Sequence, residues 1–370
     1  MVVKKLNASD VLAACTGGAV LASGGGGFYE HGLEMGRAAV AICEVPLVSL
    51  DELEDDDIVL TQTAIGAPAG TTDWQMLGRD YINAVRQVIE RHPTPSKIKG
   101  IMTPQNGKSS STNGWLAAAA LGLVVVDATG DYRAHPTGKM GNMGVANDLT
   151  YQTIQAVSGG RTETGRHIEM VVEGTSAYTS KLLRIASDLS GGFIAAARNP
   201  LTVAYLKEHA VVGGLSRAID LGYEILRHKR KKGPQRIEAI ARFTKGEILA
   251  QGTVVDKQIR YTDEAFDIGT ITIDNGQDRV LLYVQNEYMA ADGKNGERLT
   301  TYPDVITLFR TADAHPLSTN EVELGQEVTL FKIDKSHFPL SSGVTDPSVY
   351  PEVEEALGIE LYSHSFGKDD

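Results

Sequence analysis

Four consecutive glycines at residues 24–27 form the first segment that could do chemistry, and Phe28, Tyr29 and His31 follow them closely. A run without side chains can adopt positive φ angles, and it leaves its backbone N–H groups open to a close neighbour. Such N–H groups suit an anion, an oxyanion or a polar heterocycle. The alternative is a flexible joint between a helix and the next element. The first interpretation predicts that a ligand binds Gly24, Gly25, Gly26 and Gly27.

A second candidate segment, residues 103–109, contains the triplet Gly107-Lys108-Ser109. The triplet does not belong to a Walker phosphate-binding loop, because the first glycine of that motif would fall at Met102 and Pro104 removes an N–H donor. A helix N-terminus approached by glycine, lysine and serine still favours an anion or an oxyanion. The residues predicted to bind a ligand here are Asn106, Gly107, Lys108 and Ser109.

A third segment places Asp127, Asp131, Arg133 and His135 within nine positions. Carboxylate, guanidinium and imidazole groups can supply a metal ligand, a general base and an electrostatic clamp. The alternative is an Asp–Arg pair that only orders a loop. The sequence contains no HExxH, HxH or CxxC spacing. A metal ion would therefore need scattered ligands.

These segments must be positioned by the elements between them. Residues 9–21 predict a helix that Ser9 and Asp10 can cap and that leads into the glycines. Further strands are predicted at 38–45, 58–63, 100–103 and 123–126, and further helices at 73–92 and 111–121. This alternation favours an α/β layer with parallel strands, in which ligands bind beyond the carboxyl ends of the strands. The loops expected at that edge are 64–72, 103–110 and 127–142.

The rest of the chain predicts a second α/β portion. Residues 138–165 are rich in Gly, Asn, Thr and Ser and predict a boundary or a long functional loop. Strands at 167–173 and 192–197 and helices at 176–189 and 215–230 are expected after it. From residue 241 the hydrophobic period changes to two, and short turns separate the runs. The predicted fold is two-domain α/β, with a parallel-sheet domain at 1–165 and a C-terminal domain at 166–370 that carries an antiparallel β module near 241–335.

The composition of the chain limits the classes of function and partner that we expect. The chain has 370 residues, a hydrophobic content of 42% and a formal net charge of −12. The negative charge repels a phosphate backbone and argues against nucleic acid as a partner. No segment reaches the roughly 18 apolar residues of a membrane span, and the first residues do not predict a signal peptide. We expect a cytoplasmic protein without a membrane partner, in which Cys15 and Cys43 are buried and reduced.

The order of several short motifs resembles the S-methyl-thiohydantoin desulfurase-like family over nearly the whole chain. Besides the glycine run, the motifs are Gly66-Ala67-Pro68, LAAAALGLVVVDATG at 116–130, Arg133-Ala134-x-Pro136, Val212-Gly-Gly-Leu-Ser216, Gln285-Asn286-Glu287 and Tyr302-Pro-Asp304. The resemblance implies a two-domain protein whose small-molecule substrate is a five-membered hydantoin or thiohydantoin ring. It also implies zinc or another divalent metal, and a hydantoinase- or oxoprolinase-type partner protein. We further expect a homo-oligomer.

The chain departs from the family pattern at three carboxylate positions. The family has Asp-Pro after the glycines, Glu at the start of the second loop and Glu after the Arg-Ala-x-Pro motif, where this chain has Phe28-Tyr29, Gln105 and Thr137. Neutral imidazole can act as a metal ligand or as a base near pH 7, so histidine can replace a carboxylate. The metal ligands predicted on this basis are His135, His31 and Asp127.

Two functions follow from the resemblance. In the first, the protein is a hydrolase in which water attacks the ring carbon that bears the S-methyl group, and methanethiol leaves. Asp127 or His135 would activate the water, and Arg133 or Asn106 would hold the ring. Backbone N–H groups of residues 25–27 and 107–109 would stabilise the developing charge. In the second function, loss of the carboxylates has left a non-catalytic subunit that binds a ligand or a partner through the same cleft. Both predict that residues 24–27, 106–109 and 127–135 meet in that cleft.

Overall fold

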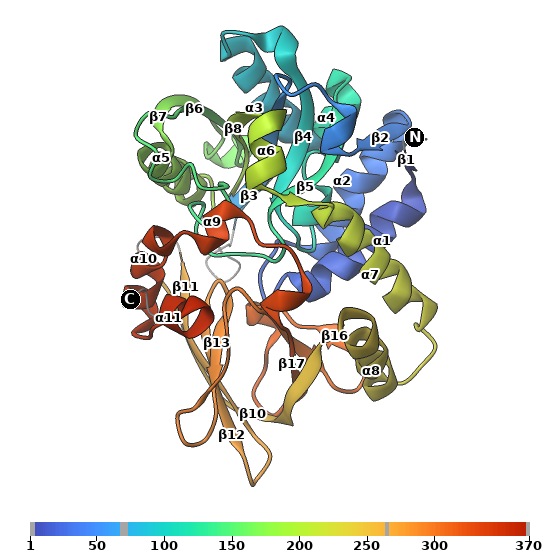
Figure 1. The fold of residues 1–370 in the computed structure, drawn as a ribbon, viewed down its shortest axis with the longest axis vertical. Coiled ribbons are helices and arrows are strands. Elements are labelled where there is room, and N and C mark those ends of the chain that lie inside the picture. Colours follow the sequence, from blue (N-terminus) through green and yellow to red (C-terminus); the bar gives the residue numbers. More distant parts are fainter. Residues whose placement is uncertain (1–3, 67–72, 263–265, 368–370) are drawn as a thin grey trace.

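The chain folds around two β-sheets that follow one another along the long axis of the molecule (Figure 1). The computed structural model describes residues 4–66, 73–262 and 266–367. Within these residues the first sheet has nine strands and contains both parallel and antiparallel pairs, whereas the eight strands of the second sheet pair only antiparallel. The predicted α/β fold with parallel strands and a separate antiparallel module is confirmed.

Four neighbouring strands of the first sheet are parallel. In spatial order they are β2 (Val45–Val48), β5 (Val124–Asp131), β4 (Ile98–Gln105) and β3 (Ile58–Gly66). Beyond β3 the sheet continues antiparallel through β8 (Phe193–Thr202), β6 (Gln152–Gly159) and β7 (Ile168–Thr175). The short strands β1 (Lys4–Leu6) and β9 (Val211–Val212) pair with β2 and β5. Strands from both sides of residue 165 thus share one sheet.

Helices cover both faces of the first sheet. One face carries α1 (Ala8–Leu21), α2 (Tyr29–Ile42), α3 (Gly78–Arg91) and α4 (Trp115–Leu121), and the other carries α5 (Ser176–Leu189) and α6 (Val203–His209). Successive side chains of a strand point to opposite faces. In β8, Ala195 and Ala197 therefore join the core under the first group of helices, whereas Ile194 and Ala196 pack with α5.

Helix α7 (Gly214–Arg227) lies directly against α1. A Cβ atom at Gly222 would lie 1.8 Å from the carbonyl oxygen of Ala13, and one at Gly17 would lie 1.9 Å from that of Ala218. Only glycine allows the two backbones to approach this closely. Because α1 leads into the glycine run, this crossing fixes the position at which the run begins.

The second sheet forms the C-terminal part of the molecule. Its spatial order is β14 (Arg298–Thr301), β13 (Glu287–Asp292), β12 (Arg279–Gln285), β11 (Asp267–Asp274), β10 (Glu247–Tyr261), β17 (Glu327–Ile333), β15 (Val305–Arg310) and β16 (His315–Pro316). Helix α8 (Gly233–Thr244) packs on it together with α7. The last helices, α9 (Ser342–Thr345), α10 (Pro351–Leu357) and α11 (Tyr362–Phe366), lie on the side of β13 (Figure 1).

The prediction of a strand at residues 38–45 is wrong. Helix α2 continues to Ile42, and β2 starts only at Val45. Gly32, Gly36 and Ala39 are buried at the spacing of one helix face. Burial of that face outweighs the β propensity of residues 40–42.

Part of the segment 138–165, predicted as a boundary or loop, is strand β6 in the interior of the first sheet. Because β6 contains polar residues, its sequence did not predict a buried strand. Gln155 is fully buried, and its Nε2 donates to Oγ1 of Thr179 on α5 at 2.6 Å. Ser158 is also buried, and its hydroxyl contacts Oδ1 of Asp80 at 3.3 Å. Hydrogen bonds of this kind allow polar residues to occupy a buried strand.

Smaller differences concern the ends of helices and one thiol. The helices predicted from residues 73 and 111 begin at Gly78 and Trp115. Asn7, rather than Ser9 or Asp10, caps α1. Cys15 is buried as predicted, but Cys43 is exposed just after α2. None of the helices in the described part of the chain combines the length and the apolar character that a membrane span requires.

Candidate functional site

A cavity of about 450 Å³ lies where the carboxyl ends of β3 and β4 approach the second sheet. The first sheet contributes Thr61, Thr63 and Gln105 to its wall, and the second sheet contributes Asn286 and Glu287. The loops that follow β4 and β5 meet here, as parallel strands predict. The loop after β3 was expected at the same edge, and its residues 67–72, including Ala67 and Pro68, lie outside the described residues.

The glycine run forms one side of the cavity through Gly25, Gly26 and Gly27. The carbonyl oxygen of Gly26 accepts hydrogen bonds from the backbone N–H groups of Ser109 and Ser110, at 3.2 and 3.3 Å. Gly26 and Gly27 have φ angles of +72° and +80°, which explains the use of glycine at these positions. Gly24 is not among the lining residues, since it packs under the ring of Tyr288.

Of residues 106–109, only Ser109 lines this cavity. Asn106 is fully buried and donates to the carbonyl oxygens of Tyr132 and Gly214, both at 3.0 Å. The N–H of Gly107 donates to Ser111 Oγ at 3.1 Å, so this donor is already engaged inside the protein.

Lys108 points to the other side of the glycine run. Its Nζ atom donates to the hydroxyl of Ser318 and to Oε2 of Glu321, the latter at 3.2 Å. These residues line a second cavity of about 340 Å³ that shares Gly27 with the first. The predicted ligand-binding lysine is thus separated from the first cavity.

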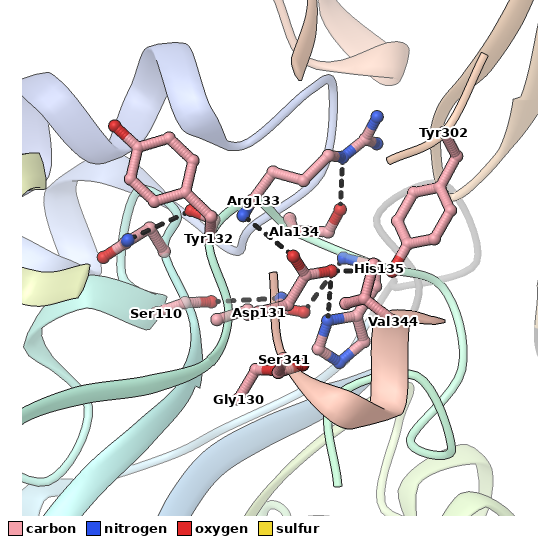
Figure 2. Close-up of polar contacts among 12 residues, drawn as sticks. Ser110, Gly130, Asp131, Tyr132, Arg133, Ala134, His135, Tyr302, Ser341 and Val344 are labelled. Atoms are coloured by element: carbon pink, nitrogen blue, oxygen red, sulfur yellow. Dashed lines mark hydrogen bonds and ion pairs between the residues drawn. The ribbon is translucent and has the colours of Figure 1, made fainter. Parts of the chain in front are cut away.

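Asp131 and His135 form a pair at the end of β5 (Figure 2). Nδ1 of His135 lies 3.3 Å from Oδ2 of Asp131, within ion-pair distance, although the contact does not have the geometry of a hydrogen bond. The hydroxyl of Tyr302 donates to the same carboxylate at 2.8 Å, and the N–H of His135 donates to Oε1 of Gln105 at 3.1 Å. The imidazole lines the cavity, and the buried carboxylate lies behind it.

Arg133 is fully buried and faces away from the cavity. Its guanidinium donates to the carbonyl oxygens of Ala134, Asp304 and Tyr288 at 2.8, 2.8 and 2.9 Å, and it lies 5.2 Å from the ring centre of Tyr302. These bonds connect the end of β5 to the second sheet. The residue predicted to hold the substrate ring instead holds two parts of the protein together.

The three residues predicted as metal ligands do not come together. Asp127 accepts a 2.9 Å hydrogen bond from the N–H of Ser216 in the first turn of α7. His31 contacts the hydroxyl of Tyr81 at 3.1 Å, and burial lowers its pKa. Of the three, only His135 lines the cavity. Across residues 4–66, 73–262 and 266–367, no three His, Cys, Asp or Glu side chains are placed to hold one ion, so the donor set does not fit a zinc site.

Two arginines that the sequence interpretation missed line the cavity. Arg184 of α5 donates to the carbonyl oxygens of Gly66 and Pro136, and its guanidinium lies 4.4 Å from the ring centre of Phe266. Arg198 of β8 donates to Ser180 Oγ at 2.5 Å, but its Nε has no hydrogen-bond partner within the described residues. Burial, and next the charge of Arg184, lower the pKa of Arg198 to about 10. Two neighbouring cations in one cavity favour an anionic ligand group.

Glu287, the first residue of β13, also lines the cavity and was not predicted. Asn286 before it has a φ of +57°, a left-handed conformation that Asn tolerates better than most residues. The carboxyl lies against Gly25, where a Cβ atom would be only 2.0 Å from Glu287 Oε1. Burial raises the pKa of Glu287 to about 8, and its Oε2 has no hydrogen-bond partner in the described part of the chain.

Two family models divide the chain between them. The "S-Me-THD-like, N-terminal domain" matches residues 9–164, and the "S-Me-THD-like, C-terminal domain" matches residues 175–338. The chain belongs to the S-Me-THD-like family. A crystal structure of a protein from Chromobacterium violaceum has the same fold, with a TM-score of 0.72 and 22% sequence identity over 97% of this chain and 99% of that chain. Among curated proteins, none matches this chain.

The residues at the three positions where the resemblance led us to expect carboxylates make contacts within the protein. Phe28 stacks on Trp74 with ring centres 5.0 Å apart. Gln105 holds the backbone of His135, and Thr137 lines the cavity as a buried residue. The substituted positions therefore have packing and hydrogen-bonding roles of their own.

Sequence signals for the missed residues exist but are weak. Arg198 interrupts the apolar strand FIAAAR, and a cation inside a buried strand indicates a special partner. Glu287 belongs to the motif Gln285-Asn286-Glu287, which the sequence interpretation used only for the family resemblance. Arg184 lies on an amphipathic helix, and nothing in its local pattern distinguishes it from a solvated charge.

Proposed function

We propose that this S-Me-THD-like protein hydrolyses a five-membered hydantoin or S-methyl-thiohydantoin-like ring that carries an anionic substituent. The observation that carries the proposal is the His135–Asp131 pair at a cavity that Arg184 and Arg198 also line. A base oriented by a carboxylate is a recurrent arrangement for activating a nucleophile. The family name supports a thiohydantoin-like ring as the substrate.

The size of the cavity agrees with such a substrate. Small-molecule sites begin at about 300 Å³, and this cavity has about 450 Å³. It can hold a ring together with a short substituent. Arg184 and Arg198 would bind the anionic substituent, because guanidinium groups bind carboxylates through charge-assisted hydrogen bonds.

His135 would remove a proton from the attacking water. His135 lies beside Asp131, and the carboxyl of Asp131 is held in place by the hydroxyl of Tyr302. The oxygen of the water adds to the ring carbon, the C–S bond breaks, and the proton held by His135 passes to sulfur as methanethiol leaves.

The test measures methanethiol release from S-methyl-thiohydantoin rings, with and without a carboxylate side chain, using a thiol-reactive dye and mass spectrometry of the hydantoin product. We expect turnover by the wild type, with the carboxylated ring preferred. His135→Asn should lower kcat by about 100-fold or more, the usual contribution of a general base. The matched control is His364→Asn, since His364 is exposed in α11 outside the cavity. Wild-type protein that releases no thiol from any ring, or His135→Asn protein at the full rate, contradicts the proposal.

The second candidate function is a non-catalytic subunit that binds the ring and a hydantoinase- or oxoprolinase-type protein. The feature in its favour is that Phe28-Tyr29, Gln105 and Thr137 stand where the family resemblance implies carboxylates. Calorimetry separates the two candidates: ring binding without turnover, together with co-elution of the partner protein, supports the subunit. Light scattering of the purified protein tests the proposed homo-oligomer.

Zinc or another divalent metal remains a proposal from the family resemblance. The donor set of the described residues does not fit such an ion, so the proposed steps use only protein groups. Elemental analysis of purified protein measures the metal content directly.

A further inference from the structure

Glu287 lines the cavity and lies directly against the glycine run. Its carboxyl fills the space that a side chain at residue 25 would take, so it touches the glycine run without an intervening group. The backbone N–H of Gly26 donates to this carboxyl, which leaves Oε2 without a hydrogen-bond partner among the described residues. The side chain is fully buried from bulk solvent and lines the cavity. A buried carboxyl with a free oxygen in a ligand cavity needs a partner, which the ligand can provide.

We propose that Glu287 carries a proton to and from the substrate ring, as the acid that complements His135 in the same cavity. This inference rests on the proposed ring hydrolysis and adds a residue to it. Glu287 belongs to the second sheet, whereas His135 follows a strand of the first sheet.

The surroundings of Glu287 come from four parts of the chain. Besides the N–H of Gly26, the charged groups that act on it are Arg133 after β5, Arg184 on α5 and Asp267 on β11. The two arginines favour the carboxylate, whereas Asp267 and, above all, burial favour the neutral acid. Burial prevails and raises the pKa of Glu287 to about 8, so most molecules hold the proton at neutral pH.

The proton transfers balance over one turnover. When the water oxygen bonds to the ring carbon, His135 takes a proton from the water and Glu287 gives its proton to the ring nitrogen of the C=N bond. The tetrahedral intermediate is then neutral, and it faces an imidazolium and a carboxylate. When the C–S bond breaks, His135 gives its proton to sulfur. Glu287 takes the hydroxyl proton as the C=O bond forms. The products are hydantoin and methanethiol, and both side chains return to their starting states.

The test uses Glu287→Gln, which keeps the shape and removes the transferable proton. We expect kcat for the S-methyl-thiohydantoin to fall about 100-fold or more, because positioned acids contribute factors of this size. Binding of the hydantoin product, measured by calorimetry, should not change. In the wild type, kcat should decline above about pH 8, where Glu287 loses its proton, and the variant should lack this decline. Glu327→Gln is the matched control, because Glu327 is an exposed carboxylate of β17 in the same sheet.

The outcomes separate this inference from the function on which it rests. Wild-type protein that releases no methanethiol overturns both. Wild-type turnover that Glu287→Gln retains at the full rate, or with an unchanged alkaline decline, overturns this inference alone. If the variant does not fold, the wild-type profile decides, since a kcat that stays constant through the alkaline range contradicts a neutral Glu287 as the proton donor.

Discussion

Arg133 and Arg198 are both buried arginines, but their surroundings differ in a way that separates structure from function. The guanidinium of Arg133 donates from Nε, Nη1 and Nη2 to three backbone carbonyl oxygens and stacks on Tyr302. The Nε of Arg198 has no hydrogen-bond partner among the described residues, and its guanidinium faces a cavity beside a second arginine. A complete set of protein partners indicates a structural role, whereas an incomplete set in a cavity indicates a ligand.

Lys108 and Glu287, two ionisable residues beside the glycine run, differ in the same way. Lys108 is paired with Glu321 on one side of the run, and Glu287 has an unpaired oxygen on the other. The number of hydrogen-bond and ion-pair partners that the fold supplies distinguishes these cases, whereas charge type and position in the sequence do not.

The largest effect is expected for Arg133→Met. The substitution leaves three buried carbonyl oxygens without donors and removes the connection between β5 and the second sheet. Removing one member of a buried charged network typically costs about 3–5 kcal/mol, so the free energy of unfolding should fall by that amount. Urea denaturation followed by circular dichroism measures it. Arg242→Met serves as the control, since Arg242 is exposed on α8. Equal stability of the two variants would refute the structural role of Arg133.

The second effect concerns pH and Glu287. Its pKa is about 8 in the folded protein against an ordinary value of 4.5 for a solvated glutamate, so between these values the folded state binds more protons than the unfolded state. Its contribution to stability is therefore complete below pH 4.5 and is lost as the pH rises towards 8. Between pH 6 and pH 8 the wild type should lose about 2 kcal/mol relative to Glu287→Gln. Thermal or urea unfolding across this range measures the difference, and parallel pH curves for the two proteins would contradict the raised pKa.

The fold was predictable because its signals are local or periodic. Helix α5 and the parallel strands follow from hydrophobic spacing, and the antiparallel module follows from period two with turn residues. Strand β6 was missed because Gln155 and Ser158 reach partners on α5 and α3 that only the folded chain brings close. Helix α2 was missed in part because its small residues pack into a surface formed by other segments.

The site was predictable only in outline. The glycine run, Ser109 and His135 meet at the carboxyl ends of the strands, as the topology implies. Asp127, predicted as a base or a metal ligand, lies at α7, whereas Asp131 at the end of β5 lies beside the imidazole of His135. Glu287 and the two arginines come from distant segments, and no spacing rule connects residues that meet only through the packing of two sheets.

The third effect is expected for Arg198→Met and concerns ligand affinity. The variant loses one of the two cations proposed to bind the anionic substituent, and affinity for a carboxylated hydantoin should fall by roughly tenfold, or about 1.4 kcal/mol. Stability should change little, since the apolar stem is kept and the repulsion by Arg184 is removed. Calorimetry with carboxylated and uncharged hydantoins tests both parts. A loss that is equal for the two ligands would show that Arg198 does not contact the anionic group.

The smallest effect is expected for Lys108→Met. This variant changes the wall between the two cavities. Burial lowers the pKa of Lys108, because it disfavours the charged ammonium group. The carboxylate of Glu321 offsets part of this effect. Methionine keeps the apolar stem, and Glu321 can be hydrated because 41% of its side chain is exposed. The free energy of unfolding should therefore change by no more than about 1 kcal/mol, as is common for ion pairs that solvent reaches. Affinity for the carboxylated hydantoin should be unchanged, since Lys108 lines the second cavity and not the first. A tenfold loss of affinity, matching that of Arg198→Met, would place the ligand across the glycine run and would remove the distinction between paired and unpaired charges at this site.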